Sequence, residues 1–96
     1  MDKIETVNLL TKVKPELEKR FGVASLALFG SMARDAASSK SDIDILVAFD
    51  VPATSAKYFG VQFLLEDLLG YSVDLVTEKA LRPELKNSIQ QDAIYV

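Results

Sequence analysis

Two short segments of the sequence decide the fold: Leu28-Phe29-Gly30-Ser31-Met32-Ala33-Arg34 and Ser41-Asp42-Ile43-Asp44-Ile45-Leu46-Val47. In the first segment an apolar run ends at a Gly-Ser turn, and in the second segment two aspartates lead into another apolar run. Carboxylates at positions i and i+2 of a strand point to the same side of the sheet. A Gly-Ser turn at the start of a helix suits a phosphate group. The two segments together indicate nucleotide chemistry.

The residues before the Gly-Ser turn predict a helix and then a strand. Apolar side chains recur every three or four residues, which is typical of an amphipathic helix. Pro15 interrupts the pattern, so we expect two helices or one kinked helix. Gly22 ends this segment, and residues 24–29 predict a short buried strand. The apolar helical face consists of Ile4, Val7, Leu10, Val13, Leu17 and Phe21.

The residues after the turn predict alternating helices and strands. A short helix is expected over 32–36, a strand over 44–49, a helix over 59–69 and a third strand over 72–77. The helix that ends before Gly70 carries Val61, Leu64, Leu65 and Leu68 on one side. Proline is favoured in the first turn of a helix, so we expect a last helix to start at Pro83, with an apolar face of Leu81, Leu85, Ile89 and Ala93.

These elements predict one domain over residues 1–96. Helices and strands alternate, so the fold class is α/β or α+β, with a short mixed sheet of about three strands flanked by helices. Neither the dinucleotide-binding pattern G-x-G-x-x-G nor the P-loop pattern occurs in the sequence.

The composition excludes several classes of function. The chain has no cysteine and no histidine, which removes thiolate catalysis and the commonest general base. Its formal charge of −3 gives no basic surface, so we expect no direct nucleic-acid binding. No apolar stretch approaches the roughly 20 residues that span a bilayer, and the first residues lack a signal-peptide pattern. We therefore expect no membrane association and a cytoplasmic location.

Three aspartates lie in or beside the predicted strands. Asp42 and Asp44 lead into the second strand, and Asp74 interrupts the apolar run of the third. Burial of an ionised carboxylate among apolar residues is costly unless it is paired or bound to a metal. Three such residues indicate a shared cation, and hard oxygen ligands favour Mg²⁺ without excluding Mn²⁺. In the alternative interpretation, Asp42 caps the start of its strand and Asp74 is an edge residue that faces water.

The Gly-Ser turn also has two interpretations. Gly30 and Ser31 form either a tight turn with a helix N-cap or a phosphate site. In the phosphate site, the Ser31 hydroxyl and the nearby amide groups donate to phosphate oxygens. The neighbouring carboxylates favour the phosphate site.

The motifs Gly30-Ser31-x-Ala33-Arg34, Ser41-Asp42-x-Asp44 and Val73-Asp74-Leu75-Val76 together resemble a known family. This family is the minimal nucleotidyltransferases, the single-domain branch of the DNA polymerase β-like nucleotidyltransferase superfamily. The resemblance extends over nearly the whole chain and implies the nucleotidyltransferase fold.

The resemblance implies a role for each motif. The turn at Gly30 and Ser31 would hold the triphosphate of ATP, and Asp42, Asp44 and Asp74 would bind two Mg²⁺ ions. Asp74 would also complete the site for the attacking hydroxyl and act as its base. An acceptor oxygen would then attack the α-phosphate in line, and pyrophosphate would leave.

Two residues beside the turn have less definite roles. Arg34 contacts phosphate or forms an ion pair that holds the motif in place. Many relatives carry glycine where this chain has Asp35. We expect Asp35 to be a solvent-facing residue favoured by the helix dipole rather than a fourth carboxylate near the metal ions.

The resemblance also implies a protein partner, because minimal nucleotidyltransferases pair with HEPN-domain ribonuclease toxins and act as their antitoxins. We expect AMP transfer from ATP to a hydroxyl of such a toxin, with tyrosine as the acceptor. A homodimer of the chain is a further possible assembly. A second hypothesis is a non-catalytic module that masks its partner through Tyr58-Phe59 or residues 93–96. A third is a nucleotidyltransferase that acts on a small molecule.

Overall fold

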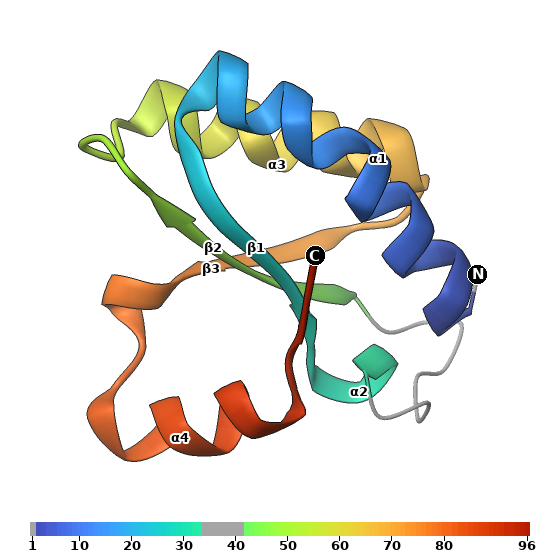
Figure 1. Cartoon of the computed structure of the whole chain (residues 1–96), viewed down its shortest axis with the longest axis vertical. Helices are drawn as coiled ribbons and strands as arrows, with labels where there is room; N and C mark the ends of the chain where they lie inside the picture. The colour runs from blue at the N-terminus through green and yellow to red at the C-terminus, as the bar shows by residue number, and fades with distance from the viewer. Residues whose placement is uncertain (1, 34–41) are drawn as a thin grey trace.

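A four-stranded mixed sheet organises the computed structural model, which describes residues 2–33 and 42–96. The elements in chain order are α1 (Lys3–Phe21), β1 (Val23–Phe29), α2 (Gly30–Ala33), β2 (Ile43–Phe49), α3 (Ser55–Leu69), β3 (Val73–Thr77), the 3₁₀ helix η1 (Glu78–Ala80), α4 (Pro83–Asp92) and β4 (Ile94–Tyr95). This arrangement (Figure 1) confirms the predicted fold class, a mixed sheet flanked by helices.

The strands lie in the order β3-β2-β1-β4. β1 runs antiparallel to both of its neighbours, whereas β2 and β3 are parallel. A parallel pair requires a crossover connection, and α3 provides it. The fourth strand was not expected, because two residues are too few to produce a strand pattern in the sequence.

Helices α1 and α3 cover one face of the sheet and form the core with it (Figure 1). The strand residues that point to this side alternate with residues that point to the other side. Every second position of β2, from Ile43 to Val47, is therefore buried against the helices. The core consists of Leu10, Val13, Leu17, Val23, Leu26, Leu28, Ala33, Ile43, Ile45, Val47, Val61, Leu65, Leu69, Val73 and Leu75.

α1 is one continuous helix, not two. Pro15 lies inside it. The Asp2 side chain accepts a hydrogen bond from the Glu5 amide at 2.8 Å, and Gly22 ends the helix in the left-handed conformation with φ 73°. The predicted apolar face is correct for its central residues Leu10, Val13 and Leu17, but Ile4 is 69% exposed, and Thr6 is the buried residue in the first turns of the helix.

α3 begins at Ser55, earlier than predicted, because the Thr54 hydroxyl caps it by accepting from the Lys57 amide at 3.3 Å. The buried residues of α3 are spaced four positions apart and lie on one side of the helix: Val61, Leu65 and Leu69. Leu68 was expected on this side but is 39% exposed, since the contact covers only a narrow stripe of the helix.

α4 lies on the other side of the sheet from α1 and α3 (Figure 1). It starts at Pro83 as predicted, yet none of its residues is buried and Leu85 is 48% exposed. The expected apolar face of this helix therefore does not enter the core. None of the described helices is long and apolar enough to span a membrane.

Candidate active site

Asp44 and Asp74 lie side by side on two neighbouring strands. They are register partners in the parallel pair of β2 and β3, and Phe29 is the partner of Asp44 on β1. Register partners on adjacent strands point to the same face. Ile43 and Ile45, which flank Asp44, are buried in the core. The two carboxylates therefore share the face that α1 and α3 leave uncovered.

Asp42 immediately precedes β2 and, by strand alternation, lies on the same side as Asp44. The Ile43 amide donates to the Ser72 carbonyl at 3.0 Å, which aligns the starts of the two parallel strands. Asp42 and Asp74 are exposed, and Asp44 is half-buried.

Burial therefore gives no reason for a cation at Asp42 and Asp74, which are exposed. Their apolar neighbours point into the core, while the carboxylates point out. Asp74 does face water on an edge strand, as the alternative interpretation held. Asp44 and Asp74 do carry like charges directly opposite each other on adjacent strands, and such a pair is destabilising.

Gly30 brings its backbone against the Asp44 carboxylate. Its φ is 71°, a conformation that favours glycine. A β-carbon added to residue 30 would overlap Oδ2 of Asp44 and would stand 2.9 Å from its Cγ. The predicted turn and one of the predicted acidic residues thus form a single site, at the junction of β1 and α2.

Only part of the predicted turn lies within the described structure. Ser31 follows Gly30 as the second residue of α2. Arg34 and Asp35 lie outside the described residues, as do residues 36–41. Their predicted roles remain predictions.

The carboxylates alone do not form a complete metal cage. Among residues 2–33 and 42–96, no group of three or more His, Cys, Asp and Glu side chains could hold a metal ion. Mg²⁺ usually binds through one or two carboxylates and completes its shell with water and substrate phosphates. Asp44 and Asp74, register partners on one face of the sheet, fit that chemistry. The absence of a side chain at Gly30 lets the turn lie directly against the Asp44 carboxylate.

Tyr95 lies on this face of the sheet and contacts Glu78, the first residue of η1. Tyr95 is the register partner of Ala27, and its hydroxyl donates to Oε1 of Glu78 at 3.1 Å. Burial raises the pKa of Tyr95 above its ordinary value, and the hydrogen bond and negative charge of Glu78 raise it further, against a smaller lowering by the hydrogen bond with Gln90. The sequence did not predict this pair, because the two residues become neighbours only through the pairing of β4 with β1.

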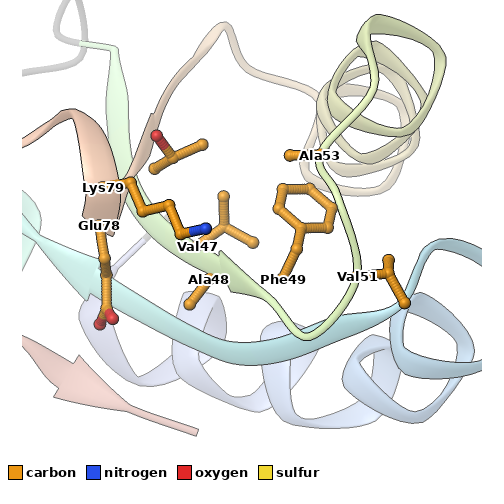
Figure 2. A pocket seen from close by; sticks show the side chains of 8 residues that line it. Val47, Ala48, Phe49, Val51, Ala53, Glu78 and Lys79 are labelled. Atoms are coloured by element: carbon orange, nitrogen blue, oxygen red, sulfur yellow. The ribbon is translucent and has the colours of Figure 1, made fainter.

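A cavity of about 360 Å³ lies at the opposite end of β2 and β3, where both strands finish (Figure 2). Figure 2 shows Lys79 extended toward Val47, while Glu78 turns away. Most of the lining is apolar, and the Asp44–Asp74 pair lies at the starts of the same strands. The cavity is therefore separate from the acidic site. Its lining residues are Val47, Ala48, Phe49, Val51, Ala53, Thr77, Glu78 and Lys79.

Comparison with known sequences identifies similar proteins along almost the whole chain. The nucleotidyltransferase domain family matches residues 10–96. A relative from Methanocaldococcus jannaschii, whose name proposes a protein adenylyltransferase, is 45% identical over 93 residues, which are 96% of this chain and 95% of the relative. Protein adenylyltransferase MntA from Thermococcus cleftensis is 38% identical over 92 residues, which are 96% of this chain and 93% of MntA.

Solved structures have the same fold. One, described as a proposed minimal nucleotidyltransferase, superimposes with a TM-score of 0.83 at 37% identity and covers 98% of this chain and 95% of its own. Another is the complex of a tri-AMPylated HEPN toxin from Shewanella oneidensis with an MNT antitoxin. It matches with a TM-score of 0.67 at 20% identity and covers 97% of this chain and 70% of its own, which supports the fold alone.

Proposed function

This chain belongs to the nucleotidyltransferase domain family, and we propose that it transfers AMP from ATP to a tyrosine hydroxyl of a HEPN-domain toxin, for which it is the antitoxin. The observation that carries this proposal is the contact between the Gly30 backbone and the Asp44 carboxylate, with Asp74 beside Asp44. This arrangement puts the turn between β1 and α2 next to two carboxylates on the face of the sheet opposite α1 and α3.

Each residue of the site has a role in this reaction. Gly30 lets the turn lie directly against the Asp44 carboxylate, and Ser31 and Arg34 would donate to the phosphate oxygens of a nucleotide bound at the turn. Asp42 and Asp44 would hold two Mg²⁺ ions, and Asp74 would complete the site for the acceptor. When bound, Mg²⁺ would neutralise phosphate charge and orient the reacting groups.

Asp74 is the residue best suited to accept the proton of the attacking hydroxyl. It is exposed on the edge strand β3, so an incoming acceptor can reach it without displacing another strand. Asp44 is half-buried between β1 and β3 and is better suited to holding a cation. The hydroxyl oxygen attacks the α-phosphorus, the bond to the bridging oxygen of the β-phosphate breaks, and pyrophosphate leaves.

Two comparisons support a protein acceptor and an antitoxin role. A relative of 38% identity is named a protein adenylyltransferase. A structure of the same fold is an MNT antitoxin in complex with a tri-AMPylated HEPN toxin. The acceptor tyrosine would be supplied by the toxin, and the assembly would be a hetero-oligomer.

A masking function without catalysis is the second candidate, and one observation favours it. Phe59 and Phe63 stack on α3 with ring centroids 6.1 Å apart, and their side chains are 48% and 63% exposed. Large exposed apolar groups mark protein-binding surfaces. The candidate segment 93–96 is less suitable, because Ile94 and Val96 pack against the core. A small-molecule acceptor has less support, since the described cavity lies at the far ends of β2 and β3.

The decisive experiment combines the chain, its HEPN-domain partner, Mg²⁺ and ATP labelled at the α-phosphate. We expect label on a partner tyrosine. The double variant Asp42→Asn with Asp44→Asn should abolish labelling, whereas Asp67→Asn removes an exposed carboxylate on α3 and should not. Absence of label from the partner, or full labelling by the double variant, would refute catalysis. Toxin neutralisation that survives in the double variant would favour masking.

A further inference from the structure

Tyr95 lies on the same face of the sheet as the Asp44–Asp74 pair. It is the register partner of Ala27, which pairs with Leu46, which in turn pairs with Val76. Leu46 is two residues after Asp44 on β2, so strand alternation puts both on one side. Ile94, the neighbour of Tyr95, packs against the core on the opposite side, in agreement with this assignment.

Of the tyrosines in the described structure, Tyr95 combines an exposed side chain with a position on this face of the sheet. Tyr95 is 46% exposed, and its hydroxyl hydrogen-bonds to the side chains of Glu78 and Gln90. Tyr58, by contrast, is half-buried against the core, and its hydroxyl donates to the Leu75 carbonyl. Tyr71, 39% exposed, lies in the connection before β3 rather than on a strand of the sheet.

The spacing of the strands brings the Tyr95 side chain within reach of the acidic site. Tyr95 and Asp44 are on the two strands that flank β1, and their partners Ala27 and Phe29 are two residues apart. Strand spacing of about 4.8 Å and a rise of about 3.3 Å per residue put their Cα atoms about 12 Å apart. A tyrosine side chain and a nucleotide held beside Asp44 together span that distance. Rotation of the Tyr95 side chain away from Glu78 would carry the hydroxyl toward Asp44 and Asp74.

We propose that Tyr95 is a self-modification site: in the absence of a partner, the chain transfers AMP from ATP to its own Tyr95 hydroxyl. This inference rests on the proposed nucleotidyl transfer. The Tyr95 oxygen forms a bond to the α-phosphorus, and the bond between that phosphorus and the oxygen bridging to the β-phosphate breaks. Pyrophosphate leaves with the electron pair, and the phenol proton passes to Asp74.

Glu78 restrains this reaction. Its carboxylate accepts the hydrogen bond of the Tyr95 hydroxyl at 3.1 Å and holds the ring pointed toward the end of β3, away from Asp44. Figure 2 shows Glu78 turned away from the cavity. Loss of this hydrogen bond removes the restraint by Glu78 and leaves Gln90 as the remaining hydrogen-bond partner, so rotation toward the nucleotide becomes easier.

The test is incubation of the full chain alone with ATP and Mg²⁺, followed by intact-mass measurement and peptide mapping. We expect addition of one AMP group at Tyr95, at a rate that does not depend on protein concentration. Tyr95→Phe should abolish the addition, and Tyr71→Phe, the matched control at the other exposed tyrosine, should not. Glu78→Ala should accelerate it about tenfold, the factor expected for loss of one hydrogen bond to a charged group.

The outcomes separate this inference from the proposed function. A chain that labels the HEPN partner but never itself would overturn self-modification alone. Labelling of neither protein would overturn both. Self-labelling that persists in Tyr95→Phe would assign another acceptor, and a rate that rises with protein concentration would assign the transfer to two copies. Slower labelling in Glu78→Ala would overturn the restraining role of Glu78.

Discussion

The carboxylate of Asp44 lies against the main chain of Gly30, at the point where β1 passes into α2. Gly30 adopts φ 71°, and a β-carbon there would stand 2.9 Å from Asp44 Cγ. The turn and the acidic strand are therefore linked by a steric requirement at one position. Any side chain at residue 30 would displace Asp44 or shift the turn, and either movement would disturb the site.

Gly30→Ala should lower both stability and nucleotide binding. A positive φ costs an alanine about 1 kcal/mol, and displacement of the Asp44 carboxylate adds to this cost. We expect the increase in melting temperature caused by ATP with Mg²⁺ to be lost, because a ligand that binds only the folded chain must stabilise it. Gly70→Ala is the matched control, since Gly70 has φ 75° with nothing within 4 Å of an added β-carbon. Equal effects on nucleotide binding in the two variants would refute a special role for Gly30.

Asp74→Asn should stabilise the protein in the absence of metal while it removes activity. Asp44 and Asp74 are register partners on one face, so neutralising Asp74 relieves a repulsion of about 0.5 kcal/mol. Transfer activity should fall by about 100-fold or more, as is typical when one electrostatic contributor is removed from a site. Chemical denaturation measures the first effect and the labelling assay the second. Asp67→Asn should change neither by a comparable amount.

The free energy of unfolding of the unmodified chain should fall more steeply with rising alkaline pH than that of the Tyr95→Phe variant. Burial and Glu78 raise the pKa of Tyr95 above 10.0 in the folded chain. The unfolded chain then loses the phenol proton at lower pH than the folded chain, so unfolding becomes easier as pH rises. The contribution is fully present below pH 10 and disappears as pH rises through the folded-state pKa. Denaturation curves at about pH 8 and about pH 11 measure it. An identical pH dependence in Tyr95→Phe would refute the assignment.

Gly60→Ala should destabilise the contact between α1 and α3. A β-carbon on Gly60 would stand 2.9 Å from Cζ of Phe21, so the ring must move. Overpacking costs about 1–3 kcal/mol, against a gain of up to about 1 kcal/mol from the better helix former, so we expect a net loss of about 1 kcal/mol. Phe21→Leu in the same chain should recover most of the loss. Additive effects of the two substitutions in a thermodynamic cycle would contradict the contact.

The main elements of the fold could be predicted because their local signals are strong. The strands that carry Asp44 and Asp74 are short apolar runs with one charged residue each, and α3 ends at a glycine. The errors have physical causes. Pro15 was expected to divide or kink the first helix, and α1 continues across it as one helix. β4 needs β1 as its partner and has little strand character alone.

The sequence by itself determined which chemistry is available. It supplied glycine at the turn and aspartates at strand positions, with no cysteine or histidine, because residue type and strand alternation are local properties. Only the tertiary structure decided that Asp44 and Asp74 are register partners, that Gly30 contacts Asp44, and that Tyr95 meets Glu78. These relationships depend on strand order and register, which packing of the core against α1 and α3 determines, since a shift of one residue would turn every side chain to the opposite face.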